Sequence, residues 1–77
     1  MNAPDPARPR KHSVTVSGHR TSLTLEPPVW EALTALAARR GQSVNALVAE
    51  IDAARTGPLS AAVRAWVVTR LREHADV

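Results

Sequence analysis

The chain has 77 residues, no cysteine and a formal net charge of +3 at pH 7. This length limits it to one small domain, and without cysteine no disulfide bond can stabilise that domain. The sequence holds no run of about 18 apolar residues, so it predicts no membrane-spanning helix. The first residues lack the apolar core of a signal peptide, and we therefore expect a cytoplasmic protein with no membrane partner.

The positive charge is concentrated near the N-terminus. Residues 26–77 hold six arginines and six carboxylates, so their charges cancel. Residues 1–25 contribute the whole +3, from Arg8, Arg10, Lys11 and Arg20 against Asp5. Prolines and a scarcity of apolar residues predict that residues 1–12 form a disordered basic arm. Such a distribution is typical of a surface that binds a polyanion, although a merely solvated arm would carry the same charge.

Residues 20–26 are predicted to form the main strand. Polar and apolar side chains alternate along it, with Arg20, Ser22 and Thr24 on one face and Leu23 and Leu25 on the other. This alternation is typical of a strand with one buried face. A single strand leaves backbone groups unpaired along its edges, and the same strand of a second copy is the simplest partner. The sequence therefore predicts a ribbon formed between two chains.

The segment before this strand also alternates, but in the opposite phase. Its apolar residues, Val14 and Val16, stand at even positions, whereas those of the main strand stand at odd ones. The phase changes across residues 17–19, so either a turn joins two short strands there or Gly18 lies in a bulge. We favour a short strand or extended arm before the main strand. We identify no internal repeat.

Three helices are predicted after the strand. Pro27 and Pro28 suit the first turn of a helix over residues 28–40, which Gly41 ends. Ser43 is a suitable N-cap for a second helix over residues 43–55. Ser60 caps a third helix over residues 60–73, and residues 74–77 are expected to fray. The folded domain is thus predicted over residues 13–73.

This order of strand, helix, short glycine turn and capped helix resembles the bacterial ribbon-helix-helix superfamily, of the MetJ and Arc type. The resemblance covers roughly residues 13–72. It is carried by Gly18-His19-Arg20-Thr21-Ser22, by Leu25-Glu26-Pro27 with Trp30, and by Ser43-Val44-Asn45-Ala46-Leu47-Val48-Ala49-Glu50-Ile51-Asp52. A third helix beginning Leu59-Ser60-Ala61-Ala62-Val63-Arg64 resembles one branch of short bacterial proteins in that superfamily.

The resemblance implies a mainly α-helical fold with one N-terminal β-strand and a third C-terminal helix. Two copies would form an intertwined homodimer, whose intermolecular two-stranded antiparallel ribbon lies in the major groove of double-stranded DNA. The residues that match base-contacting positions are Arg20, Ser22 and Thr24. The residues that match the phosphate-anchoring start of the second helix are Ser43, Val44 and Asn45.

Physical chemistry supports both roles. Helix N-termini offer unpaired amides and a partial positive charge to a phosphate. Arginine grips guanine O6 and N7 together, whereas serine and threonine read bases loosely, so we expect modest specificity. The arm residues Arg8, Arg10 and Lys11 are candidates for further contacts to the DNA backbone.

A domain this small needs an additional source of stability, and a core shared between two copies supplies one. The residues expected in this dimer core are Leu23, Leu25, Trp30, Leu33, Leu36, Leu47, Val48 and Ile51. The sequence shows no glycine-rich phosphate loop and no nucleophile paired with a base, so we predict no enzymatic activity. We also predict no cofactor and no metal site.

Together these features predict a sequence-specific DNA-binding transcriptional regulator, a nucleoid-associated homodimer that acts as a repressor and can assemble into higher orders on DNA. The alternative is an antitoxin or adaptor, whose third helix binds a protein partner while DNA binding is secondary or non-specific. Apolar residues of that helix, Trp66, Val67, Val68 and Leu71, favour the alternative because a small dimer core has little room for them.

Overall fold

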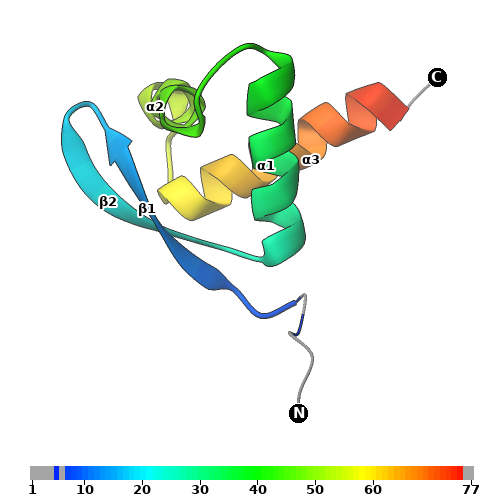
Figure 1. Ribbon diagram of the computed structural model, residues 1–77, viewed down its shortest axis with the longest axis horizontal. Helices are drawn as coiled ribbons and strands as arrows, with labels where there is room; N and C mark the ends of the chain where they lie inside the picture. The colour runs from blue at the N-terminus through cyan, green and yellow to red at the C-terminus, as the bar shows by residue number, and fades with distance from the viewer. Residues whose placement is uncertain (1–4, 6, 76–77) are drawn as a thin grey trace.

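The computed structural model describes residue 5 and residues 7–75, and it contains a two-stranded sheet followed by three helices. The strands are β1 (Arg10–Val16) and β2 (His19–Leu25), and the helices are α1 (Pro27–Arg39), α2 (Val44–Ala54) and α3 (Leu59–Ala75). Figure 1 shows the hairpin as a separate layer to one side of the helices. Helix α2 packs against β1, and α3 packs against β2 and both other helices.

The two strands pair antiparallel within one chain, across a turn of two residues. Val16 pairs with His19, so Ser17 and Gly18 alone make the turn. Their φ angles are 53° and 80°, and positive φ at both central residues is typical of the tight turns that match the twist of a hairpin. Of the two interpretations of this segment, the turn between two strands is therefore confirmed.

This pairing adds a strand to the single N-terminal strand that the resemblance implied, and the ribbon between two chains stays a prediction. The partner of β2 is β1 of the same chain, so β2 is not the lone strand that the sequence analysis assumed. The change of phase across the turn is the sign of this hairpin. A two-residue turn pairs even-numbered residues of β1 with odd-numbered residues of β2, and paired residues point to the same side of the sheet. Val14 therefore lies on the same side as Leu23.

The ends of the chain also differ from the prediction. Arg10, Lys11 and His12, expected in the disordered arm, form the first half of β1. Before them, the amide of Arg8 donates a hydrogen bond to the carbonyl oxygen of Asp5, at 3.0 Å. Residues 1–4 and 6 of the expected arm lie outside the described residues. At the other end α3 continues to Ala75, which includes residues that were expected to fray.

The helix boundaries follow from local chemistry. Pro27 and Pro28 occupy the first turn of α1, where amide donors have no partner within the helix. The Oγ of Ser43 accepts a hydrogen bond from the amide of Ala46, at 3.0 Å, and this confirms its role as the N-cap of α2. Gly41, at φ 69°, directly follows the C-cap residue of α1 and adopts a conformation that other residues rarely adopt.

Glu26, immediately before α1, ties the start of that helix to α3. The Nε of Arg64 donates a hydrogen bond to its carboxylate at 3.0 Å. The pKa of Glu26 is lowered from its usual 4.5, first by a hydrogen bond from its own backbone and then by that from Arg64. The carboxylate therefore stays charged over the neutral range.

The apolar core is closed within one chain. Every residue expected in the dimer core is buried except Trp30, which is half-buried against it. The outer side of Trp30 is covered by His12, whose ring stacks on it at 3.7 Å between centroids. The core also holds residues that the sequence analysis did not assign to it: Val14, Val16, Ala37, Val63 and Val67. Apart from Ala37 on α1, these additional core side chains come from β1 and α3.

We predict that Leu47→Ala lowers the free energy of unfolding by about 2–5 kcal/mol, because it leaves a cavity beneath the hairpin. Leu47 is fully buried. Chemical denaturation of the purified protein measures the change. Val68→Ala is the control, since that side chain is 47% exposed and should alter stability by about 0.5 kcal/mol or less. Equal effects of the two substitutions would contradict the assigned core.

Candidate nucleic-acid interface

The side of the hairpin that faces away from the core carries only hydroxyl and basic side chains over its central positions. Three cross-strand pairs make up this exposed ribbon face: Lys11 with Thr24, Ser13 with Ser22, and Thr15 with Arg20. The opposite side holds Val14, Val16, Leu23 and Leu25, all buried. Because the apolar side is packed into the core, the six polar side chains project from a fixed platform.

The ribbon is electrostatically positive. Between Arg10 and Leu25 the sequence has three basic residues and no carboxylate. Four arginines that lie in the helices or directly after them form ion pairs with carboxylates: Arg40, Arg55, Arg64 and Arg70. Within the described part of the chain, neither Lys11 nor Arg20 has such a partner. Their charges are therefore available to a polyanion.

The dimensions of the exposed ribbon face suit the major groove of DNA. Two paired strands lie about 4.8 Å apart, and the four-residue step from Lys11 to Thr15 spans about 13 Å. The major groove is about 12 Å wide and admits a two-stranded ribbon. Basic side chains on such a ribbon can grip the O6 and N7 atoms of guanine, and hydroxyls can bond to either base type.

The N-terminus of α2 lies beside the outer edge of β1. The backbone amide of Thr15 donates a hydrogen bond to the Oδ1 atom of Asn45, at 3.2 Å. Thr15 and Asn45 are 30 residues apart in the sequence, so this bond fixes the helix relative to the ribbon. Figure 1 shows α2 near the hairpin tip, where Thr15 lies one residue from the end of β1.

The first amides of α2 are open to an anion. Ser43 accepts from the amides of Ala46 and Leu47 through its Oγ and its carbonyl oxygen. The amides of Val44 and Asn45 have no acceptor among the described residues. The Asn45 side chain, in contrast, already contacts the ribbon through its oxygen. This side chain fixes the position of the helix, while the two backbone amides at its start stay without an acceptor.

The structure places the basic residues of the expected arm in different parts of the molecule. Arg8 precedes β1 and is exposed, and Arg10 begins the strand opposite Leu25. Lys11 belongs to the exposed ribbon face, beside the residues predicted to contact bases. The sequence analysis did not assign Ser13 and Thr15 to this face. Their alternation with Val14 and Val16 was the signal that could have placed them there.

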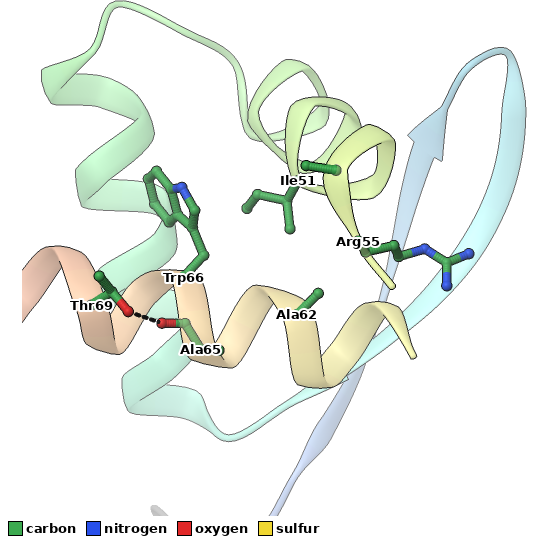
Figure 2. A pocket seen from close by; sticks show the side chains of 7 residues that line it. Ile51, Arg55, Ala62, Ala65, Trp66 and Thr69 are labelled. Atoms are coloured by element: carbon green, nitrogen blue, oxygen red, sulfur yellow. Dashed lines mark hydrogen bonds between the residues drawn. The ribbon is translucent and has the colours of Figure 1, made fainter. Parts of the chain in front are cut away.

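A second feature of the surface is a pocket of about 280 Å³ between α2 and α3. Figure 2 shows Ile51, Ala62 and Trp66 around it, with Thr69 bonded to the carbonyl oxygen of Ala65 at 2.8 Å. On α3 the side chains of Val68 and Leu71 are 47% and 45% exposed. Neither of these two side chains lines the pocket.

Among the described residues, no group of three side chains is arranged to hold a metal ion. No helix in the described part of the chain combines the length and apolarity needed to cross a membrane.

The order of a two-stranded antiparallel ribbon followed by helices, with a capped helix start beside the ribbon, defines a class of small DNA-binding domains. The comparison with protein families agrees. The family model described as "Ribbon-helix-helix domain" matches residues 9–71, and the chain belongs to this family. Searches of curated proteins and of solved structures found no significant match.

We predict that Asn45→Ala exposes the Thr15 amide to solvent exchange. One hydrogen bond of this kind contributes about 0.5–1.5 kcal/mol, so exchange of the amide should be about 2- to 12-fold faster. Hydrogen exchange followed by NMR measures it. Asn45→Asp is the matched control, because it keeps an acceptor oxygen and should leave the exchange rate of Thr15 close to that of the unmodified protein.

Proposed function

We propose that this protein is a sequence-specific DNA-binding transcriptional regulator that acts as a repressor, with its ribbon in the major groove. The observation that carries the proposal is the exposed ribbon face. Six hydroxyl and basic side chains lie on a rigid two-stranded platform, in a segment without a carboxylate. Membership of the ribbon-helix-helix family supports DNA as the ligand.

In this proposal Arg20, Ser22 and Thr24 contact bases. Arg20 is the strongest discriminator, because its guanidinium can make two parallel hydrogen bonds to guanine. The start of α2 anchors a phosphate through the free amides of Val44 and Asn45, and Ser43 holds that end of the helix in shape. Arg8 and Arg10, beside the start of β1, supply further charge toward the backbone.

We propose in addition that the protein acts as a homodimer in the cytoplasm, associated with the nucleoid. Family membership supports a second copy as partner. In this proposal the homodimer is intertwined, with an antiparallel ribbon between the β2 strands of the two copies, because among the described residues no strand pairs with the second edge of β2. Repression would follow when the bound protein excludes polymerase from the occupied site.

We predict that Arg20→Ala weakens binding to the preferred DNA by about 5- to 140-fold, the range expected for one lost bidentate contact. The preferred sequence is first selected from a random DNA pool, and affinities are then measured by titration at fixed salt concentration. Arg39→Ala, which removes the same charge from α1 outside the ribbon, is the matched control.

Thermal melting of both variants at protein concentrations tenfold apart checks that the fold is intact, and a homodimer would melt at a higher temperature when more concentrated. Unchanged DNA affinity of Arg20→Ala would contradict the assigned contact face. Melting that is independent of concentration would contradict the homodimer.

A second candidate function is that of an antitoxin or adaptor, which the apolar surface of α3 supports. Val68 and Leu71 are the large hydrophobic side chains exposed within the described residues. We expect a Val68→Ser, Leu71→Ser variant to keep its DNA affinity. If that variant also stops regulating a reporter gene in cells, or loses a protein partner encoded beside it, the partner-binding function is favoured over direct repression.

A further inference from the structure

Another hollow, of about 390 Å³, lies between the end of α1 and the C-terminal half of α3. Three arginines line it, Arg39, Arg40 and Arg70, together with the ring of Trp66. Within the described residues, the only carboxylate among its lining side chains is that of Glu73. Its volume is in the range of pockets that hold small molecules. Figure 1 shows the C-terminal half of α3 extending away from the hairpin, so this hollow is separate from the exposed ribbon face.

Two of these arginines are held against one aromatic ring. The Cζ atoms of Arg40 and Arg70 lie 5.6 and 5.2 Å from the centre of the Trp66 ring. A guanidinium this close to an indole is attracted by the negative face of the ring. The C-cap residue of α1 and a residue of α3 therefore bring two positive charges together, although like charges repel. An anion bound between them would offset that repulsion.

Both guanidinium groups keep donors that the protein does not use. The Nη1 of Arg70 donates to Glu73 at 2.8 Å, but its Nε is buried and has no hydrogen-bond partner. In the described part of the chain, no other buried side-chain nitrogen or oxygen is left in this state. Arg40 donates through Nε to Gln42 and through Nη2 to Glu50, and its Nη1 has no acceptor among the described residues. Buried donors are nearly always paired, because an unpaired one costs free energy, so the Nε of Arg70 favours an acceptor from outside the chain.

The end of α1 contributes little negative charge to the hollow. The last carbonyl oxygens of this helix accept hydrogen bonds from the amides of Arg40, Gly41 and Gln42. The partial charge of a helix end resides on carbonyl groups that lack such partners. Charged side chains therefore determine the potential in the hollow, and three arginines against one carboxylate make it positive.

We infer that this hollow binds a small organic anion, either a phosphate monoester or a carboxylate. Its oxygens accept hydrogen bonds from the unused donors of Arg40 and Arg70, because the planar fork of a guanidinium matches an oxyanion. Its apolar part lies against Leu36, which is buried, and Trp66, which is half-buried. The site goes beyond the proposed DNA binding, since it includes no residue of the exposed ribbon face or of the start of α2.

Isothermal titration calorimetry at fixed ionic strength tests the inference, with phenyl phosphate and phenylacetate as probes. The tighter of the two identifies the oxyanion. Inorganic phosphate lacks an apolar part and benzyl alcohol lacks a charge, so both should bind more weakly. In a parallel NMR titration, the indole N–H signal of Trp66 should shift. The signal of Trp30, whose ring is stacked against His12, should stay in place.

Two substitutions in the hollow should act in opposite directions. Arg70→Ala should weaken binding of the preferred probe by about 10- to 150-fold, as expected for one lost charge-assisted hydrogen bond. Glu73→Gln removes the carboxylate and releases the Nη1 of Arg70, so it should strengthen binding by about 2- to 5-fold. Arg72→Ala is the matched control, because it removes the same charge from an exposed position of α3 outside the hollow. Circular dichroism melting of each variant confirms that it is folded.

Several results would overturn the inference. One is the absence of binding by both organic anions, and another is binding that Arg70→Ala changes no more than Arg72→Ala does. Tighter binding of inorganic phosphate than of either probe would show that the hollow takes an ion alone. If a DNA duplex displaces the probe and Arg70→Ala also weakens DNA affinity, the hollow belongs to a nucleic-acid surface instead. None of these results concerns the ribbon, whose role is tested by Arg20→Ala.

Discussion

The turn at Ser17 and Gly18 is the constraint on which the rest of this structure depends. Both residues have positive φ, which glycine adopts without cost and serine adopts less readily. A two-residue turn permits one register, and that register determines which side chains share each side of the ribbon. A shift by one residue would bring Val14 and Val16 to the surface and bury the hydroxyls. The turn therefore specifies both the core and the exposed ribbon face.

The core and the exposed ribbon face support each other through the same two strands. Fully buried Leu23 and Leu25, with Val14 and Val16, hold the ribbon against α2 and α3. The bond between Thr15 and Asn45 then places the start of α2 at the edge of β1. Groups that would contact bases and groups that would contact phosphate are thus held together before any ligand arrives. A surface that is organised in advance loses little conformational entropy on binding.

Much of this arrangement could be predicted because it is local. Pro27, Gly41 and Ser43 mark helix boundaries through their own backbone preferences, and the alternation from Arg20 to Leu25 gives the polar side of β2 directly. The pairing of β1 was harder to predict, since Pro9 and the basic residues beside it are typical of a disordered arm. The contact between Thr15 and Asn45 joins residues 30 positions apart, and no local pattern indicates it.

A partner strand within the same chain changes what the sequence can specify. A ribbon between two identical chains must carry the same residue at both equivalent positions, whereas a hairpin encodes each position separately. Here the exposed ribbon face carries Lys11 on β1 and Arg20 on β2. The guanidinium is a planar fork that matches two acceptors at once, whereas the ammonium is a compact point charge on a flexible stem. Under the proposed DNA binding, Arg20 on β2 would therefore discriminate between bases more strictly than Lys11 on β1.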